Sequence, residues 1–466
     1  MDKDTICAIS SSPGNGAIAI IRLSGDDAVN ICDGIFYSKS GIKIIDQKTN
    51  TIQLGKIKSN NKIIDEVLIS LFKLPNSYTG EDIVEISCHG SSYIQQKILQ
   101  LLIHNGARIA KPGEFTLRAF MNRKMDLSQA EAVADLIAST SKASHSLAIN
   151  QMRGGFSSEI NKLRNQLLQF VSLIELELDF SEEDVEFADR KKLSVLISDI
   201  KKLVEHLIKS FELGNVIKNG IPITIIGEPN VGKSTLLNIL LNENKAIVSE
   251  IPGTTRDIIE DVINIDGYNF RFIDTAGIRQ TTDEIETLGI KKTFEKIGQA
   301  SIVLFLVDAI DSSNIINQKI SELKKSLISN KTIIVIVNKT DLIKDKEINK
   351  FSKEHFPSLD KNDALIYISA KNKTNIKLLT DKLIDLLNLP SLNEEHVVVT
   401  NLRHYEALLK VAQGIERILN GLKNQISNDF LAQDVREVLH YLGEITGEVT
   451  NDEILGNIFS NFCIGK

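Results

Sequence analysis

A glycine-rich loop at residues 227–234, Gly-Glu-Pro-Asn-Val-Gly-Lys-Ser, contains the residue types that bind phosphate. A hydrophobic run precedes this loop and an apolar periodic segment follows it, which predicts a strand, a loop and a helix in that order. In such a loop the backbone N–H groups face a phosphate chain, Lys233 contacts the β- and γ-phosphates, and the Ser234 hydroxyl is a ligand for Mg²⁺. The loop therefore predicts a site for a nucleoside triphosphate.

Two further motifs predict that the base of this nucleotide is guanine. They are Asn-Lys-Thr-Asp at 338–341 and Ser-Ala-Lys at 369–371, and each follows a predicted hydrophobic strand. The carboxylate of Asp341 accepts hydrogen bonds from the ring N–H and the exocyclic amine of guanine, whereas adenine presents the wrong groups to it. A site built on such polar pairing rejects the wrong base by roughly 10⁴-fold or more, so we expect GTP rather than ATP.

The segment between these motifs contains residues suited to sensing the γ-phosphate. Asp274 begins Asp-Thr-Ala-Gly at 274–277 and is placed to hold Mg²⁺ through water, while the N–H of Gly277 meets the γ-phosphate. Upstream, Thr255 would reach Mg²⁺ only when a γ-phosphate orders its loop, which predicts a switch. The dipeptide Asp266-Gly267 predicts a tight hairpin between two strands that lie between these loops.

The group that orients the attacking water is not evident from these motifs. Ile278 stands directly after Asp-Thr-Ala-Gly, where many small GTPases carry a glutamine. Three acidic residues follow, Asp283, Glu284 and Glu286, and any of them is suited to polarising water. A solvated acidic helix start is the alternative, and we favour it for at least two of the three.

Composition indicates an ordinary globular protein of about three domains, with 466 residues, 42% hydrophobic and 25% charged. No apolar stretch approaches membrane-spanning length and the first four residues do not begin a signal peptide, so we expect a cytoplasmic protein without membrane attachment. The four cysteines are far apart, which argues against structural zinc and disulfides. Cys463 begins the C-terminal Cys-Ile-Gly-Lys, whose Gly and Lys fit a prenylation signal poorly.

The net charge of −7 gives no global attraction to nucleic acid, so RNA contact would need a local patch. Basic residues gather near the end of the first quarter of the chain, and ordinary solvated charge explains them equally well. They are Arg108, Lys111, Arg118, Arg123 and Lys124.

Changes in periodicity divide the chain into four segments. Residues 1–119 alternate short strands with turns and predict an N-terminal α+β domain, and residues 120–219 show helical spacing. Residues 220–387 contain the nucleotide motifs, and helical spacing returns at 388–466. We therefore expect a multidomain fold in which a Ras-like α/β P-loop GTPase domain is inserted into an α-helical bundle domain built from both flanks.

At this point the chain resembles, over nearly its whole length, the MnmE (TrmE) family of tRNA modification GTPases. Beyond the nucleotide motifs, the resemblance rests on Ala-Ile-Ala-Ile-Ile-Arg-Leu-Ser-Gly at 17–25, Ser-Tyr-Thr-Gly-Glu-Asp at 77–82, Cys-His-Gly at 88–90, Pro-Gly-Glu-Phe-Thr-Leu-Arg-Ala-Phe at 112–120, Lys-Met-Asp-Leu-Ser-Gln-Ala-Glu-Ala at 124–132, Ile-Thr-Gly-Glu at 445–448 and Cys-Ile-Gly-Lys at 463–466.

The resemblance implies work with an FAD-containing partner, MnmG (GidA), in a heterotetramer. Together they would install a carboxymethylaminomethyl or aminomethyl group on carbon 5 of the wobble uridine of certain tRNAs. The N-terminal domain is similar to the family's homodimerising domain, which binds 5-formyl- or methylene-tetrahydrofolate as the one-carbon donor. By position, Arg22, Glu81, Lys124 and Lys466 match the family's folate-contacting residues. Their chemistry agrees with this match, since cations suit the glutamate tail and a carboxylate suits the pterin N–H edge. Cys463 matches the family's C-terminal cysteine, and its role stays open.

The resemblance also implies hydrolysis that depends on potassium. Asn230 matches a side-chain ligand of K⁺, the remaining ligands match Ser249, Ile251 and Thr254, and Glu286 matches the acid that positions water. Pro252 departs from the small residue expected in the potassium loop and would stiffen it without removing a carbonyl ligand. We expect Lys233, Thr255 and Glu286 to be catalytic, and Ser234 and Thr255 to bind Mg²⁺. The expected GTP-binding residues are Asn230, Val231, Gly232, Lys233, Ser234, Thr235, Ser249, Thr254, Thr255, Asp274, Thr275, Ala276, Gly277, Asn338, Lys339, Asp341, Ser369 and Ala370.

Two functions of different classes remain open. One is an enzyme whose GTP hydrolysis drives tRNA modification, and the other is an RNA-docking switch GTPase of ribosome assembly. The motifs at 77–82 and 463–466 favour the enzyme, because an RNA-docking module has no evident need for them.

Overall fold

The computed structural model describes residues 4–179, 190–243, 261–273, 300–326, 331–343, 356–360, 362–386, 397–460 and 462–466. The chain divides into two compact units. The first contains Met1–Ala134, Gln151–Val204 and Glu406–Lys466, and the second contains Asp135–Asn150 and Glu205–Tyr405.

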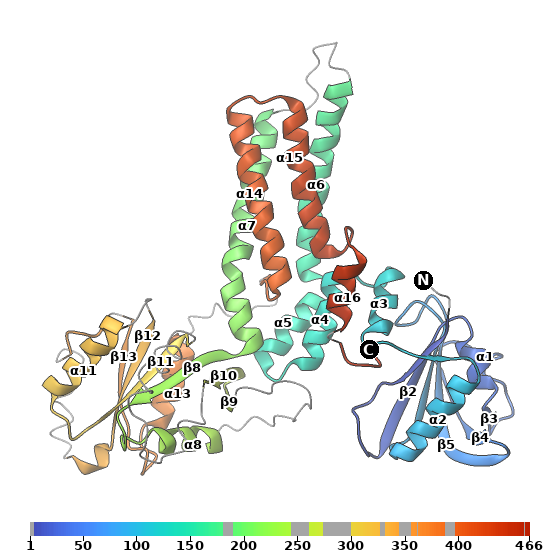
Figure 1. Cartoon of the computed structure of the whole chain (residues 1–466), viewed down its shortest axis with the longest axis horizontal. Coiled ribbons are helices and arrows are strands. Elements are labelled where there is room, and N and C mark those ends of the chain that lie inside the picture. The colour runs from blue at the N-terminus through green and yellow to red at the C-terminus, as the bar shows by residue number, and fades with distance from the viewer. Residues whose placement is uncertain are drawn as a thin grey trace. The chain divides into compact units, whose positions relative to one another are not determined.

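The N-terminal part of the first unit is a seven-stranded sheet with the order β3-β4-β5-β6-β2-β1-β7. Its neighbours pair antiparallel except for β1 and β7. One face is covered by helices α1 (Ala28–Asp33) and α2 (Ser92–His104), because Ile31 and Ile98 are buried against strand residues such as Ile21 (Figure 1). The strands are β1 (Ile6–Ile9), β2 (Ile18–Ser24), β3 (Phe36–Ser38), β4 (Thr51–Ser59), β5 (Lys62–Phe72), β6 (Ile83–His89) and β7 (Arg108–Ile109).

The opposite face of this sheet carries exposed apolar side chains. Leu54 and Leu68 are directly opposite each other on β4 and β5 and are 43% and 45% exposed. Ile52 and Ile18 lie on the same face by the strand alternation and are also exposed. We call these four residues the open sheet face. Apolar patches of this kind commonly mark contact surfaces.

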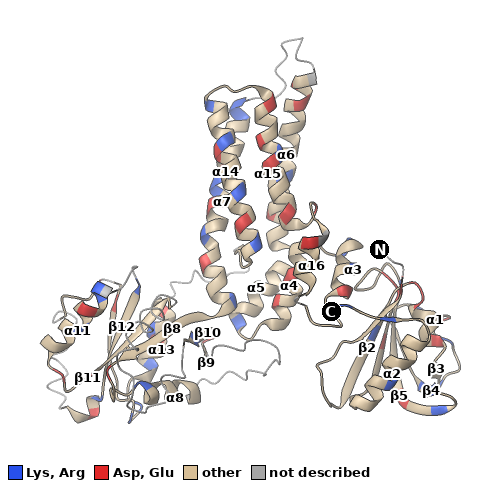
Figure 2. Cartoon of the chain, in the orientation of Figure 1, with Lys and Arg blue, Asp and Glu red and all other residues tan. Residues whose placement is uncertain are grey.

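Four long helices from both sides of the nucleotide segment form a bundle (Figure 1). They are α6 (Gly155–Asp179), α7 (Arg190–Asn219), α14 (Leu402–Lys423) and α15 (Asn428–Thr446). Glu177 of α6 is buried and paired with Arg190 of α7, and it accepts a hydrogen bond from Asn428 Nδ2 of α15 at 3.0 Å. The predicted helical domain built from both flanks is therefore confirmed. Figure 2 shows acidic and basic residues interleaved along these helices, without a stripe of one sign.

The nucleotide segment forms a six-stranded sheet with the order β13-β12-β11-β8-β10-β9, parallel except for the β10–β9 pair. Its central strands are continuous apolar runs because both faces are buried. One face packs against α8 (Lys233–Glu243) and α13 (Ile376–Leu386), and the other against α11 (Ser313–Ser326). The strands are β8 (Ile221–Gly227), β9 (Asp261–Ile265), β10 (Tyr268–Phe272), β11 (Ile302–Asp308), β12 (Thr332–Asn338) and β13 (Ala364–Tyr367). The predicted α/β P-loop domain is confirmed, and its sheet has helices on both faces.

The hairpin predicted from Asp266-Gly267 is present between β9 and β10. Ile265 lies opposite Tyr268, so the turn between the strands contains only Asp266 and Gly267. Their φ angles are 49° for Asp266 and 87° for Gly267, and a type I′ turn requires positive φ at both positions.

Further, shorter helices lie outside the segments described above. They are α3 (Glu114–Met121), α4 (Leu127–Ala138), α5 (Lys142–Met152) and α16 (Asp452–Ser460). None of the described helices is long and apolar enough to cross a membrane.

Two of the basic residues considered above as an RNA patch, Arg108 and Arg118, form ion pairs within the N-terminal domain. Arg118 is only 4% exposed, and its guanidinium lies 2.7 Å from Asp4 Oδ1 and 3.2 Å from Glu81 Oε2. Arg108 lies 2.6 Å from Asp4 Oδ2 and 2.7 Å from Glu114 Oε1. Hydrogen bonds from Arg108 and then Arg118 hold the pKa of Asp4 below its usual value despite partial burial. The RNA interpretation is thus wrong for Arg118, and the charge of Arg108 is neutralised locally.

Candidate functional site

The phosphate loop lies between β8 and α8, as the motif predicted. Its Lys233 Nζ donates to the carbonyl oxygens of Gly227 and Glu228, at 2.7 Å each. Burial lowers the pKa of Lys233, which shows that its ammonium is partly withdrawn from water. Phosphate oxygens can take over the interactions that these carbonyls now make. Ser234 and Thr235 lie in the first turn of α8, where N–H groups face outward.

Asn338 joins the phosphate loop to the two base motifs. Its side chain is 2% exposed at the carboxyl end of β12. The Nδ2 group donates to Val231 O at 2.8 Å, and Oδ1 accepts from Ala370 N at 2.9 Å. Three segments that are distant in sequence are therefore held together by one amide.

The carboxylate of Asp341 is available to accept hydrogen bonds from a base. Ser369 Oγ donates to Asp341 Oδ1 at 2.6 Å, and this bond is the main cause that lowers the pKa of the Asp341 carboxyl. The carboxylate is therefore ionised at neutral pH and keeps acceptor positions for further donors. These contacts bring Asp341 and Ser369 together as the sequence motifs predicted.

One residue near the base motifs was not identified from the sequence. Asp308 ends β11, and its Oδ2 lies 2.6 Å from Lys339 Nζ. Lys339 itself has a φ of 67°, which few non-glycine residues adopt. The only sequence signal was an aspartate at the end of a buried apolar run, a position where parallel strands present functional groups.

Seven of the eighteen expected GTP-binding residues, together with the expected K⁺ ligand Ile251 and the expected catalytic Glu286, lie outside the described residues. The structure places the loop residues 230–235 together with 338–341 and 369–370 at the carboxyl ends of β8, β12 and β13. The expected residues outside the described part of the chain are Ser249, Ile251, Thr254, Thr255, Asp274, Thr275, Ala276, Gly277 and Glu286.

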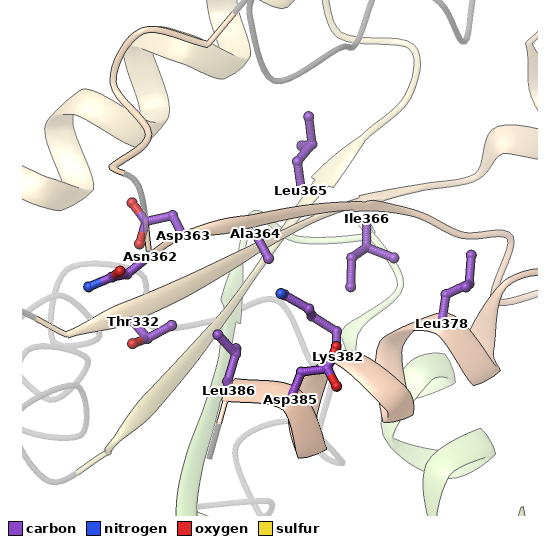
Figure 3. Close-up of a pocket in the computed structure, with 10 residues that line it drawn as sticks. All are labelled: Thr332, Asn362, Asp363, Ala364, Leu365, Ile366, Leu378, Lys382, Asp385 and Leu386. Carbon is purple, nitrogen blue, oxygen red and sulfur yellow. The ribbon is translucent and has the colours of Figure 1, made fainter. Parts of the chain in front are cut away.

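A cavity of about 580 Å³ lies at the other end of this sheet (Figure 3). It is lined by Thr332 and Ala364, the first residues of β12 and β13, and by Lys382 and Asp385 of α13. Its lining residue Asp363 already bonds the Ile333 N–H at 3.0 Å and the Lys324 ammonium. Because the nucleotide motifs lie at the carboxyl ends of the strands, this cavity is not the nucleotide site.

Arg22 is the centre of the candidate site in the N-terminal domain. Its Nε donates to Glu85 Oε1 at 2.8 Å, and its guanidinium carbon lies 5.5 and 5.6 Å from the ring centres of Tyr78 and Phe115. Those distances are within the range of cation–π attraction. The guanidinium is thus close to two aromatic rings and paired with one carboxylate, which restricts its position on β2.

The C-terminal residues approach this arginine. Gly465 O accepts from Arg22 NH1 at 3.4 Å and from Ser10 Oγ at 3.0 Å, and Cys463 O accepts from Gly113 N at 3.4 Å. Cys463 is exposed, whereas Cys7, Cys32 and Cys88 are buried free thiols, as expected. Burial raises the pKa of both Cys7 and Cys88 to about 11, so neither is a thiolate at neutral pH.

Glu81 is oriented from two sides. Ser24 Oγ donates to Glu81 Oε2 at 2.7 Å and Arg118 NH1 bonds both of its oxygens at 3.2 Å. Ser24 and Arg22 alternate onto the same face of β2, so Glu81, which bonds Ser24, lies at the face that carries Arg22. We call Arg22, Tyr78, Phe115 and Glu81 the Arg22 group. Lys124 Nζ donates to Pro75 O at 3.0 Å, and Lys466 N donates to Cys463 O at 3.3 Å.

Comparisons with known proteins cover the whole chain. A family model described as "GTP-binding protein TrmE N-terminus" matches residues 5–124, and one described as "MnmE helical domain" matches residues 127–463. The "tRNA modification GTPase MnmE" of Bacteroides thetaiotaomicron is 55% identical over 474 residues, with 100% of each chain covered. The protein of the same name from Flavobacterium johnsoniae is 54% identical over 468 residues, also with complete coverage of both chains.

We predict that Asp341→Asn weakens GTP binding by about 1–3 kcal/mol, because an acceptor facing the guanine donors becomes in part a donor. Xanthosine triphosphate, whose base presents an acceptor there, should be bound better by the variant than by the wild type. Titration with fluorescent nucleotides measures both effects. Asp385→Asn, in the cavity at the far end of the sheet, is the matched control and should change neither affinity. Equal GTP affinity in wild type and Asp341→Asn would contradict the base assignment.

Proposed function

Because the chain belongs to the MnmE (TrmE) family of tRNA modification GTPases, we propose that its GTP hydrolysis drives a chemical change at the wobble uridine of certain tRNAs. The change is the addition of a carboxymethylaminomethyl or aminomethyl group to carbon 5, made in the cytoplasm with the FAD-containing MnmG (GidA). Full-length identity of 54–55% to proteins named tRNA modification GTPases supports this proposal most strongly. The chain is a GTP hydrolase that acts in tRNA modification.

The described motif residues have separate roles in binding GTP. Asp341 and Ser369 select the base, Asn338 fixes the distance between base and phosphates, and Lys233 supplies a cation to the β- and γ-phosphates. We assign Mg²⁺ to Ser234 and Thr255, and the positioning of the attacking water to Glu286. Bound Mg²⁺ would neutralise phosphate charge, and hard oxygen donors such as hydroxyls suit it.

Potassium is proposed as a further cation at the phosphates. Asn230 lies in the phosphate loop with a φ of 59°, a conformation that asparagine tolerates better than most residues. Its side chain is exposed, so its amide oxygen is accessible to a hard monovalent cation. Ser249, Ile251 and Thr254 are the other proposed ligands. The ion would supply positive charge where Ras-like enzymes use an arginine, an effect on the order of 10³- to 10⁵-fold in rate.

We predict faster GTP hydrolysis in potassium than in sodium at equal ionic strength, by at least about tenfold. Asn230→Gly should lose most of this difference and still bind nucleotide, because glycine accepts the same positive φ without the amide ligand. Glu286→Ala should lose turnover in both salts, since it acts on water. Steady-state phosphate release measures these rates. Identical rates of the wild type in both salts would refute the potassium site.

We propose that the Arg22 group binds 5-formyl- or methylene-tetrahydrofolate. The fit rests on the Arg22 guanidinium close to two aromatic rings and on the oriented carboxylate of Glu81. Arg22 suits the carboxylates of the folate tail, and Glu81 retains acceptor positions for the pterin N–H groups. Lys124 and Lys466 would add positive charge. The bound folate would supply the one-carbon unit.

Calorimetry with 5-formyl-tetrahydrofolate tests this assignment. Arg22→Ala should weaken binding by about tenfold or more, because a charge-assisted hydrogen bond contributes roughly 1.5–3 kcal/mol. Deleting residues 463–466 should also weaken it. Lys62→Ala, at an exposed position on β5, is the control and should leave binding unchanged. If Arg22→Ala and the deletion both bind folate as the wild type does, the site is misplaced.

The partners follow from the same proposal. The open sheet face, with Leu54 opposite Leu68, is a surface suited to a second copy of the chain, and it adjoins Arg22 across β6 and β2. We therefore propose a homodimer through the N-terminal domains, which joins MnmG in a heterotetramer and binds tRNA.

Nucleoside mass spectrometry separates this function from the ribosome-assembly alternative. In cells that lack the gene, tRNA should lose the carbon-5 substituents of wobble uridine, and the wild-type gene should restore them. A gene carrying Lys233→Ala should restore none, because the phosphates lose their cation. Unchanged tRNA nucleosides together with incomplete ribosomal subunits would favour the alternative.

A further inference from the structure

The tip of the β9–β10 hairpin is bonded to the segment that begins α5. Gly267 O accepts from Ala143 N at 3.1 Å, and Asn269 Nδ2 donates to Thr140 Oγ1 at 2.8 Å. Asn269 is 7% exposed, so its amide is withdrawn from water. All four residues belong to the second compact unit.

The hairpin presents these groups in a fixed geometry. Asn264 Nδ2 donates to Asn269 Oδ1 at 2.9 Å, and Asn264 Oδ1 accepts from Gly267 N at 3.2 Å. The amide of Asn269 is therefore held so that its nitrogen is directed at Thr140. A Cβ atom added to Gly267 would lie 3.0 Å from Cβ of Lys142, a tight contact, and the φ of 87° at this position also favours glycine.

An apolar cluster extends the contact beyond the hydrogen bonds. Tyr268 and the half-buried Leu213 of α7 pack against buried residues on α5, near the end of α7 and on the segment before α14, namely Ala143, Leu147, Ile217 and Val398. The chain enters the α/β domain from α7 into β8 and leaves it through the segment that contains Val398. The hairpin tip thus contacts both connections as well as α5.

The other end of the hairpin leads to the nucleotide site. In the sequence, β9 follows the loop that contains Thr255, and only Ile273 separates β10 from Asp274 of Asp-Thr-Ala-Gly. Strand β10 also pairs with β8 from Phe270 to Phe272, and β8 continues into the phosphate loop. Five opposite residue pairs join β9 to β10, so a displacement at one end of this ladder moves the other end.

We propose that the β9–β10 hairpin couples the nucleotide site to α5 and α7, with Asn269 and Thr140 as the positioning residues. The nucleotide state shifts the hairpin, and the bonds at its tip carry the shift to the first turn of α5. This inference rests on the GTP binding proposed above, and it is independent of potassium, folate and the partner protein.

Hydrogen exchange of the Ala143 amide in the full-length protein reports on this bond directly. We expect its exchange rate in the wild type to differ by about fivefold or more between the GDP state and the state with a non-hydrolysable GTP analogue. Thr140→Val removes the acceptor and keeps the shape, and it should abolish most of the difference. Asn269→Ala should do the same. Both variants should bind nucleotide within about twofold of the wild type, since they lie outside the nucleotide contacts.

A double-mutant cycle separates coupling from a merely structural role. If the two side chains act through their shared bond, the double variant should lose no more of the nucleotide-dependent difference than either single variant. Asp266→Asn, in the same turn, tolerates positive φ and should behave as the wild type. A difference of wild-type size in both variants would overturn the proposal, and so would a wild type that binds both nucleotides without any difference. Failure to bind GTP at all would instead refute the proposed function.

Discussion

The position of the base site relative to the phosphate site depends on the side chain of one buried residue. Asn338 uses its donor on the phosphate loop and its acceptor on the loop after β13, and it comes from the end of the strand between them. Loss of either bond would leave a buried backbone group without its partner, at a cost of roughly 1–3 kcal/mol. The amide therefore fixes the distance between the phosphate loop and the base motifs, and a bound nucleotide must fit that distance. The strands β8, β11 and β12, buried on both faces, hold Asn338 rigidly.

In the N-terminal domain, the same charged residues stabilise the fold and orient the candidate binding site. Arg118 is buried and pairs with Asp4, Glu81 and Glu114, and Arg108 supplies a second positive charge to Asp4 and Glu114. Glu81 in turn bonds Ser24, two residues from Arg22 on β2. The orientation of a candidate ligand-binding carboxylate is thus fixed by an ion-pair cluster that also stabilises the domain. Such support from rigid elements is what a precise binding site requires.

Motifs with strict local requirements were readable from the sequence. The phosphate loop needs a strand before it and a helix after it, and the Asp-Gly turn needs two positive φ angles, so both were predicted correctly. Contacts between distant segments were not predictable. Arg118 was grouped with surface cations because nothing near it in the sequence indicates Asp4, more than a hundred residues away. The bond between Asn269 and Thr140 spans 129 positions, and the pairing of Asp308 with Lys339 depends on the order of strands in the sheet.

The carbonyl of Gly465 lies against Ser10 and Arg22, contacts that span 455 and 443 positions. During synthesis an N-terminal domain can fold while the rest of the chain is still being made, at about 5–20 residues per second. Gly465 is added roughly 20 to 90 s after Arg22 at that speed. For that interval the newly folded sheet exposes an arginine whose last partner does not yet exist. The Arg22 group is therefore completed only after residue 465 has been added, long after the sheet that carries Arg22 has been made.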